Sequence, residues 1–394
     1  MSILLSEHLK MLYSSILRIS LKGIMLLKEK LMVVFVIIFA VLGVVYLYMH
    51  LPMFGRLPQG ERLARMQKMP NYIDGQFHNL HATPVLVKKG LGSTWFSFLF
   101  RNQKNLKPPK ALPSLKTDLK KLDPKEDIMV WFGHSSYFLQ INGKRILIDP
   151  LFSEVSSPVL FFPKAFEGTC TYQADDIPEL DYLIITHDHW DHLDYQAIKK
   201  LREKVKKVIC PLGVGETLER WEFDKNQVIE MYWGDSQSLN NELVIYCLPS
   251  RHFSGRGFLR NKTLWASFLI QSKDLKLYFS GDSGYDNHFK EIQKKFGAVD
   301  FAMLDSGQHN ESWKYIHMLT PDVIHAVQDL KTKTLIPSHI CKLSLAYHPW
   351  DEPMEELVEL SKDKNFKLFI PMIGEKINLH AKELPLKTWW RDIK

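Results

Sequence analysis

The chain has 394 residues, of which 45% are hydrophobic, 12% aromatic and 24% charged. This composition can bury a large core and excludes a wholly disordered chain, while 20 Gly and 20 Pro exclude collagen-like and low-complexity classes. The net charge of +7 is uneven, because residues 1–127 carry 19 Lys/Arg against 8 Asp/Glu and the remaining residues carry 32 against 36. The excess positive charge therefore lies in the N-terminal part, which argues against a nucleic-acid partner.

The first structural feature along the chain is the apolar run Leu31–Met49, nineteen residues without a charged side chain. At 1.5 Å per residue, this run is long enough to cross about 30 Å of hydrocarbon as a helix. Residues 31–50 are therefore predicted to form a transmembrane helix of a single-pass membrane protein, and the nearest cations, Lys28 and Lys30, favour a cytoplasmic N-terminus. The side of the membrane that holds the rest of the chain stays open. A buried core helix and a cleaved signal peptide are the alternatives, and the run exceeds the usual length of a signal-peptide core.

Residues 1–30 form a basic segment in front of this run. Apolar residues recur there at spacings of four and three with cations between them, which predicts a surface-lying amphipathic helix over residues 4–26: Leu5, Leu9, Leu12, Ile16 and Ile19. The alternative is an overlong start, with Met11, Met25 or Met32 as the true initiator.

Residues 51–121 are rich in Lys, Pro and Gly and show little periodicity, so they are predicted to be a linker and an irregular N-terminal lobe. Residues 122–394 are predicted to be an α/β domain in which short apolar strands alternate with helices. The predicted strands are Ile128–Phe132, Tyr137–Ile141, Arg145–Ile148, Tyr182–Thr186, Lys207–Cys210, Leu243–Leu248, Leu264–Gln271, Leu275–Ser280, Phe301–Leu304, Thr334–Pro337 and Lys367–Pro371. The predicted helices are Tyr195–Val205, Pro321–Leu330 and Glu355–Lys362.

Two smaller patterns belong to the same domain. Asn142-Gly143, between two predicted strands, is typical of a tight hairpin turn. The four cysteines have no paired spacing, so they predict buried small side chains rather than a disulfide framework or a thiolate metal site.

The motif that carries the chemistry follows the strand Tyr182–Thr186. It reads His187-Asp-His189-Trp-Asp191-His192, and a helical stretch comes after it. Alternation in an extended segment places the first two histidines on one side, and the turn into the helix brings Asp191 and His192 back towards the same point. Imidazoles with one carboxylate favour Zn²⁺ over Mn²⁺ or Fe.

Three further candidate ligands, His252, Asp282 and His339, each come just after a predicted strand. Ligands at the ends of several strands can converge at one edge of a sheet. The seven residues suffice for two divalent metal ions. One arrangement assigns His187, His189 and His252 to the first ion and Asp191, His192 and His339 to the second, with Asp282 between them.

The sequence resembles the metallo-β-lactamase fold, and more closely the N-acyl-phosphatidylethanolamine-hydrolysing phospholipase D branch of that superfamily. The resemblance runs from about Phe54 to Gly374. Besides the metal motifs, it rests on the segments Gly133–Ser136, Ile148–Ser153, Phe162–Phe166, Leu264–Phe268, Gly281–Tyr285 and Ile316–Pro321.

The resemblance implies a four-layer αβ/βα sandwich with a dinuclear site at one edge, in which Asp282 bridges the ions. It also implies that His317 lies near the phosphate of the substrate, although the spacing His317-Met-Leu-Thr-Pro321 is one residue longer than the pattern of the family. Asp149 and His134 are expected to orient ligand imidazoles, or to serve as structural turn residues. The family further suggests a homodimer.

The sequence therefore predicts a membrane-anchored zinc phosphodiesterase that hydrolyses N-acyl-phosphatidylethanolamine to phosphatidic acid and N-acylethanolamine. Asp191 or Asp282 is expected to handle the proton, and Arg251 or Lys342 to offset the phosphate charge unless these are ordinary surface cations. The partners expected are a phospholipid substrate and the bilayer. Two alternatives are a hydrolase of the same fold acting on a soluble lactone or phosphodiester, and a non-enzymatic membrane-binding module.

Overall fold

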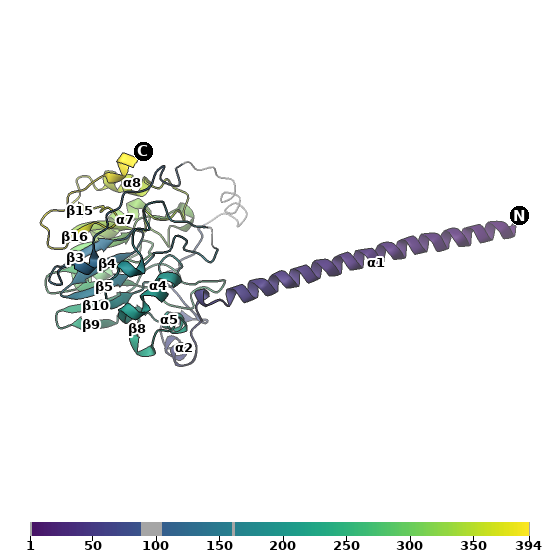
Figure 1. Cartoon of the computed structure of the whole chain (residues 1–394), viewed down its shortest axis with the longest axis horizontal. Coiled ribbons are helices and arrows are strands. Elements are labelled where there is room, and N and C mark those ends of the chain that lie inside the picture. Colours follow the sequence, from purple (N-terminus) through teal and green to yellow (C-terminus); the bar gives the residue numbers. More distant parts are fainter. Residues whose placement is uncertain (1, 88–104, 160–161, 394) are drawn as a thin grey trace. The chain divides into compact units, whose positions relative to one another are not determined.

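The computed structural model describes residues 2–87, 105–159 and 162–393, and the chain divides into two compact units, residues 1–54 and 55–394 (Figure 1). The first unit holds helix α1 (Ser2–Met49) and the short 3-10 helix η1 (Pro52–Phe54). Within α1, Leu27–Met49 is long and apolar enough to cross a membrane, by length and composition. The helix is continuous, so the expected amphipathic segment 4–26 and the apolar run belong to one element. The side chains of Leu5, Leu9, Ile16 and Ile19 lie outside the described part of the chain.

Two seven-stranded sheets form the framework of the second unit. The strands of the first sheet are β3 (Ile128–Trp131), β4 (Tyr137–Ile141), β5 (Lys144–Ile148), β6 (Leu180–Ile184), β7 (Val205–Pro211), β8 (Val228–Met231) and β16 (Lys376–Asn378). Those of the second are β9 (Ser236–Asn240), β10 (Leu243–Leu248), β11 (Ser267–Gln271), β12 (Lys276–Phe279), β13 (Phe301–Asp305), β14 (Thr334–Ser338) and β15 (Lys367–Leu368). A separate hairpin pairs β1 (Tyr72–Ile73) with β2 (Gln76–Phe77).

Each sheet joins an antiparallel half to a parallel half. The first has the order β16-β3-β4-β5-β6-β7-β8, antiparallel as far as β5 and parallel beyond it. The second has the order β15-β14-β13-β12-β11-β10-β9, antiparallel from β9 to β12 and parallel from β12 to β15. The parallel strands all end at one edge of their sheet, which is where the candidate ligands were predicted to meet.

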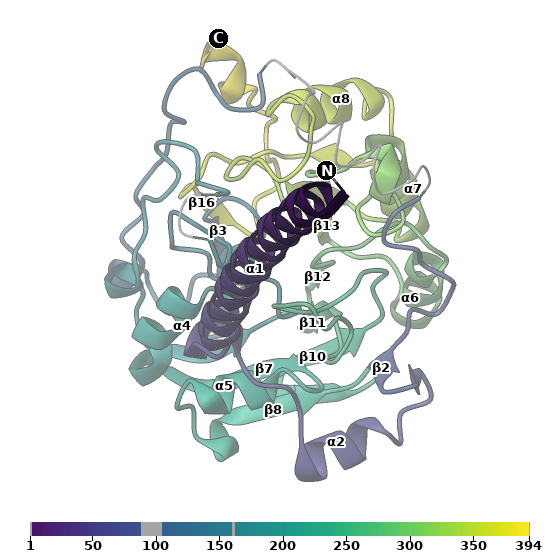
Figure 2. The same ribbon diagram turned by 90° about the vertical axis from the view of Figure 1, so that its right-hand side faces the viewer.

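Helices cover the outer face of each sheet. They are α4 (Tyr195–Leu201), α5 (Gly215–Arg220), α6 (His288–Phe296), α7 (Thr320–Asp329) and α8 (Glu352–Leu360), whereas α2 (Gly60–Met66) lies beside α5 and the edge strand β8. Figure 2 shows α4 to the left of the sheets, α5 beside β7 and β8, and α6 and α7 to the right. Six short 3-10 helices also occur among the described residues of this unit: η2 (Leu119–Lys121), η3 (Ala174–Asp176), η4 (Arg202–Lys204), η5 (Lys225–Gln227), η6 (Glu311–Trp313) and η7 (Trp389–Ile393).

The burial of β3 shows how the layers are held together. Met129 and Trp131 belong to a core cluster shared with the second sheet and with α6, α7 and α8, whereas Ile128 and Val130 belong to a second cluster shared with α4 and α5. Successive side chains of a strand point to opposite faces, so one short strand joins both clusters. The layers are therefore helix, sheet, sheet and helix, the order that the resemblance implied.

Most predicted elements are present. Each predicted strand overlaps an observed one, and the Asn142-Gly143 turn joins β4 to β5 with a positive φ at both residues, as a type I′ turn requires. The predicted helix Tyr195–Val205 is too long, because α4 ends at Leu201 and Val205 begins β7. All four cysteines are free thiols, and all except Cys170 are buried.

The expected linker 51–121 differs most from the structure. The second compact unit begins at Gly55 rather than near residue 122, and the described part of this segment contains α2, the β1–β2 hairpin and η2. Met66, Phe77 and Leu112 are fully or almost fully buried in the larger core cluster. Residues 88–104 of the predicted linker lie outside the described residues. The N-terminal lobe is therefore part of the catalytic unit.

Candidate metal centre

The His187–His192 motif lies in the loop between β6 and α4. The loop is fixed at its end by Asp194, whose side chain accepts hydrogen bonds from the first backbone N–H groups of α4 and from Ser153. Across the loop, the buried Arg256 guanidinium donates to the carbonyl oxygens of Asp188 (3.0 Å) and Leu193 (2.8 Å). The motif is therefore held in one conformation from both sides.

Four side chains form a first cluster, namely His187, His189, His252 and Asp282, with one potential ligand atom of each within 4.8 Å of the others. The Nδ1 atom of His189 lies 2.9 Å from Nε2 of His187 and 3.2 Å from Nε2 of His252. The Nδ1 atom of His252 faces the carbonyl oxygen of Ile316 at 2.9 Å, which leaves its Nε2 atom directed into the cluster. Three ring nitrogens thus converge on one point, as ligands of a cation do.

A second cluster lies beside the first and contains His134, Asp191, His192 and His339. The Oδ2 atom of Asp191 is 2.8 Å from Nε2 of His134, 3.2 Å from Nε2 of His339 and 3.7 Å from Nε2 of His192. His134 was expected only to orient a ligand, but its ring nitrogen shares this cluster. The structure therefore brings it as close to Asp191 as the predicted ligands themselves.

Asp282 lies between the two clusters. Its Oδ2 atom is 3.7 Å from Nε2 of His187 and 3.5 Å from Nε2 of His339, while its Oδ1 atom is 3.0 Å from Nε2 of His192. The last two atoms are buried without a well-aligned hydrogen-bond partner, although they face each other. A cation between them would satisfy both, so the donor set fits a pair of divalent metal ions.

Asp149 orients His192 from behind. Its Oδ2 atom accepts hydrogen bonds from Nδ1 of His192 (2.8 Å) and from Oγ1 of Thr186 (2.6 Å), and its Oδ1 atom accepts from the Thr186 backbone N–H. A proton held on Nδ1 leaves the Nε2 lone pair of His192 free to bind a metal ion. This is the orienting position that the sequence predicts for Asp149.

Comparison with known proteins agrees with this geometry. Residues 144–340 match the model of the beta-lactamase superfamily domain, and an uncharacterised Mycobacterium tuberculosis protein is 32% identical over 331 residues, covering 82% of this chain and 88% of that protein. The chain belongs to the metallo-β-lactamase superfamily. With two His/Asp clusters suited to metal ions, it is a metal-dependent hydrolase of that superfamily.

Two further comparisons concern a sequence relative and a structural neighbour. The mitochondrial N-acyl-phosphatidylethanolamine-hydrolysing phospholipase D of Saccharomyces cerevisiae is 31% identical over 257 residues, covering 62% of this chain and 54% of that protein. The crystal structure of CmlA, a diiron β-hydroxylase from Streptomyces venezuelae, superposes with a TM-score of 0.51 at 20% identity, covering 66% of this chain and 55% of that one. The second likeness concerns the fold alone.

Asp305 is the site residue that the sequence reasoning missed. It is buried at the end of β13, where its Oδ2 atom lies 2.7 Å from Nδ1 of His317 and its Oδ1 atom lies 3.4 Å from Nδ1 of His339. His317 stacks on His339, with ring centroids 5.0 Å apart and planes 9° apart. Asp305 stands at a strand end like the predicted metallo-β-lactamase ligands, so the same positional rule could have found it.

We predict that Asp305→Asn weakens metal binding by about 10- to 100-fold, because the amide can no longer hold the rings of His317 and His339 as the carboxylate does. Competition with a chromophoric chelator measures this affinity directly. Asp274→Asn, on the exposed turn between β11 and β12, is the matched control and is expected to bind metal normally. Equal metal affinities in the two variants would show that Asp305 has no part in metal binding.

Burial and neighbouring charges divide the titratable groups of the site into two sets. Burial lowers the pKa of His187 and His252 well below the ordinary value of a histidine, so both rings are neutral, as metal ligands must be. Burial also opposes ionisation of Asp191 and Asp282, yet His192 and the other surrounding histidines hold the pKa of both carboxyl groups well below the usual range. His187 and His252 are therefore neutral and both carboxylates are ionised, whereas for His192 and His339 burial lowers the pKa less than Asp282 and the neighbouring carboxylates raise it.

The two clusters open into a pocket of about 270 Å³. The polar part of its lining consists of residues of the two clusters, His317 and Gln308. The apolar part consists of Val85, Leu86, Phe253, Trp313, Ile316 and Leu345. His317 lines this pocket, which agrees with a role in contacting substrate. The pocket is too small to enclose a diacyl lipid and large enough for a headgroup.

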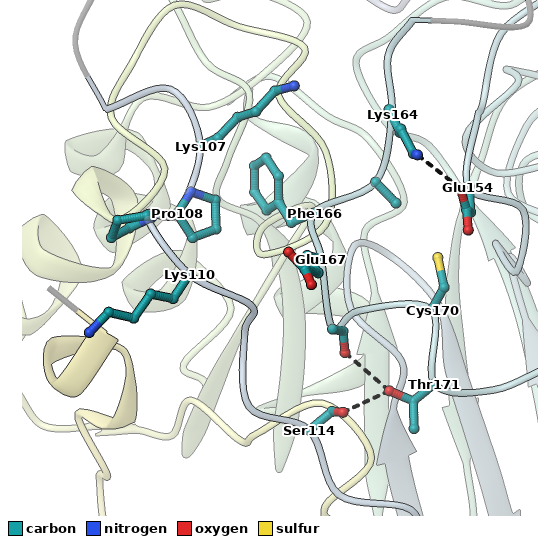
Figure 3. Close-up of a pocket in the computed structure, with 13 residues that line it drawn as sticks. Lys107, Pro108, Lys110, Ser114, Glu154, Lys164, Phe166, Glu167, Cys170 and Thr171 are labelled. Carbon is teal, nitrogen blue, oxygen red and sulfur yellow. Dashed lines mark hydrogen bonds and ion pairs between the residues drawn. The ribbon is translucent and has the colours of Figure 1, made fainter.

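A larger hollow of about 630 Å³ lies elsewhere, between the segments 107–114 and 154–171 (Figure 3). It contains none of the predicted site residues. In Figure 3 the ammonium groups of Lys107 and Lys110 point away from each other, and Lys164 pairs with Glu154 at 3.3 Å. Without converging groups, this hollow has no arrangement that suggests chemistry.

The structure places neither of the two cations considered for the phosphate charge at the site. Lys342 is fully buried, and its ammonium donates to the carbonyl oxygens of Phe132 (3.2 Å) and Thr169 (3.4 Å), so it is neither a surface cation nor directed at the site. Arg251 donates instead to the side chain of Thr83 and to the Ala82 carbonyl oxygen. Neither residue lines the metal pocket. Both cations hold chain segments together.

Proposed function

We propose that the protein is a membrane-anchored, two-metal phosphodiesterase that hydrolyses N-acyl-phosphatidylethanolamine to phosphatidic acid and N-acylethanolamine. The observation that carries the proposal is the position of Asp282, whose carboxylate oxygens lie 3.0–3.7 Å from histidines of both clusters. The activity named for the yeast relative, which this chain matches over 54% of its length, supports the lipid substrate.

In this proposal His187, His189 and His252 hold one ion, and Asp191, His192 and His339 hold the other, with Asp282 between them. Two bound divalent ions, proposed to be Zn²⁺, would make water nucleophilic near neutral pH and offset the charge of a phosphodiester. Asp149 fixes the tautomer of His192, and Asp305 fixes the ring directions of His317 and His339.

The remaining roles fall to residues at the pocket. His317 would lie beside a phosphate oxygen, with its ring held through Nδ1 by Asp305. Asp191 or Asp282 would accept the proton of the attacking water. The apolar wall formed by Val85, Leu86 and Trp313 suits the lipid side of the scissile bond, and the small pocket volume leaves the acyl chains outside.

The membrane anchor in this proposal is Leu27–Met49, with the N-terminus in the cytoplasm. The basic residues at the start of the span suit the negative surface potential of a cytoplasmic leaflet. A tethered catalytic unit would act on substrate within the bilayer that holds it. The homodimer implied by the resemblance remains a prediction.

The test is phosphatidic acid release from vesicles that contain N-acyl-phosphatidylethanolamine, measured with the full chain, with and without a chelator. We expect release that the chelator abolishes and that added Zn²⁺ restores. A water-soluble phosphodiester and a lactone are assayed in parallel. Hydrolysis of those substrates without any release from the lipid would reject the lipid assignment in favour of a soluble substrate.

A further inference from the structure

The most exposed apolar side chains of the catalytic unit lie on a few neighbouring segments. Among the described residues of 55–393, six large apolar side chains are at least half exposed, and all but Leu57 lie on three connected segments, two of which line the metal pocket: Ile73, Leu80, Leu86, Phe258 and Leu259. Phe258 is the most exposed, at 83%. Scattered exposed apolar residues are ordinary, but a group of five beside a catalytic pocket indicates an interaction surface.

Three segments carry these residues, and hydrogen bonds join them. The hairpin 72–77 meets the loop 253–262 through the Phe77 backbone N–H, which donates to the Asn261 carbonyl oxygen (2.8 Å), and through Lys262, whose ammonium donates to the Gly75 carbonyl oxygen (2.7 Å). The segment 79–87 meets the metal site through Asn79, whose side-chain amide pairs with both backbone groups of His252. We call these three segments together the rim.

Hydrogen bonds hold the backbone of the rim against the rest of the unit. The Arg251 guanidinium donates to Oγ1 of Thr83 (2.9 Å) and to the Ala82 carbonyl oxygen (3.0 Å), and the Val87 backbone N–H donates to the Ser312 carbonyl oxygen. Figure 2 shows the chain after β2 running past α6 towards α7, as these contacts require. The apolar side chains are therefore presented to solvent by a braced backbone.

The rim is also continuous with the pocket. Leu86, which is half exposed, lines the pocket together with Phe253 from the loop of the rim. Phe253 packs against the ring of His189, with centroids 4.4 Å apart. The Arg260 guanidinium lies over the Phe253 ring, 5.1 Å from its centroid. A lipid whose chains lie along the rim would therefore have its headgroup at the metal clusters.

The charged side chains of the rim indicate which kind of surface it binds. The rim contains three Lys/Arg, namely Arg256, Arg260 and Lys262, against one carboxylate, Asp74. Arg256 and Lys262 donate to backbone carbonyl oxygens, whereas Arg260 is exposed beside the Phe258-Leu259 tip. Apolar side chains flanked by cations are typical of segments that bind anionic membrane interfaces.

We propose that the rim is the surface by which the catalytic unit docks on an anionic phospholipid bilayer, with Phe258 and Leu259 entering the boundary between headgroups and acyl chains. This inference deepens the proposed function and rests on it for the lipid substrate. Docking would admit a headgroup to the pocket while the acyl chains stay in the bilayer. Docking itself does not depend on turnover, so the two ideas can fail separately.

The direct test places a fluorescent label at Phe258→Cys in a Cys170→Ser background, since the other three cysteines are buried. The full chain is reconstituted in mixed phosphatidylcholine and phosphatidylserine vesicles. Nitroxides on the lipid chains are expected to quench this label, and an aqueous nickel chelate is expected not to. The control, Leu360→Cys on α8 away from the rim, is expected to show the reverse.

Equal aqueous quenching at the two positions would overturn the proposal. So would a label at position 258 that is shielded only as the protein concentration rises in lipid-free micelles, because the occupant would then be a second copy of the chain. Quenching from the lipid chains without release of phosphatidic acid would keep the docking surface and reject the proposed substrate.

A kinetic test uses the double variant Phe258→Ser/Leu259→Ser. Loss of two apolar anchors is expected to raise KM for vesicle-borne substrate by about tenfold or more, with kcat/KM for a water-soluble phosphodiester unchanged. Leu360→Ser/Leu386→Ser removes two other exposed leucines and is expected to leave both values unchanged. An equal loss on both substrates would mean that the double variant damages the site, and would contradict a docking role.

Discussion

Asp282→Asn is expected to lower kcat/KM for phosphodiester hydrolysis by more than about 100-fold, since residues that only orient metal ligands already cost 10- to 100-fold when replaced. The substitution keeps the shape of the side chain and removes its charge. The carboxylate faces Nε2 atoms of His187, His192, His252 and His339 at 3.0–3.7 Å. No other described carboxylate faces both clusters, so both ions should be lost or weakly held.

Metal content and activity should fall together in this variant. Elemental analysis of the purified variant is expected to give fewer than two ions per chain, while circular dichroism shows a folded protein. Asp274→Asn is the control, because Asp274 is an exposed carboxylate before β12, at the opposite end of that strand from Asp282. Full metal content with full activity in Asp282→Asn would show that the two clusters do not share this carboxylate.

Arg62→Ala is expected to have the largest effect on stability. Its guanidinium is paired with three carboxylates, Glu216, Glu219 and Glu230, and so joins α2 to α5 and β8. The Arg62 side chain is 11% exposed, and those of Glu216 and Glu230 are 4% and 10% exposed. Removing the cation takes away the cationic partner of the buried Glu230, which keeps only backbone donors among the described residues, and leaves Glu216 with Arg56 as its remaining cationic partner, which costs about 3–5 kcal/mol of unfolding free energy.

Denaturant unfolding of the detergent-solubilised chain measures this cost. Arg65→Ala is the matched control on the same helix, because Arg65 is 47% exposed and its partner Asp235 is 3.7 Å away. An exposed pair of this kind contributes about 0–1 kcal/mol. If the two alanine variants unfold alike, the N-terminal lobe is not held to the catalytic unit by the Arg62 cluster.

The sequence predicts the metal site better than the part of the chain that surrounds it. The His187–His192 motif is a local pattern, and His252, Asp282 and His339 follow strands whose apolar runs are readable. Asp305 also stands at the end of a predicted strand. However, no motif surrounds this carboxylate, so the sequence gives no reason to choose it as a site residue. Its role becomes visible only when β13 brings it beside His317 and His339.

The burial of the N-terminal lobe in the core could not be predicted, because the contacts that hold it there are tertiary. Met66, Phe77 and Leu112 are buried but widely spaced, so no periodic pattern marks them. The edge strand β9, Ser236–Asn240, has a mostly polar sequence and is recognisable only by its pairing with β10. Lys342 and Arg251 were misjudged for a related reason, since burial and backbone partners decide what a cation does.

The central claim is that two metal ions held by these clusters perform the hydrolysis. The most direct measurement strips the full chain with a chelator, returns Zn²⁺ in known amounts and follows bound metal and phosphodiester hydrolysis together. The account predicts that activity reaches its plateau at two ions per chain. A plateau at one ion, or full activity in metal-free protein, would contradict it.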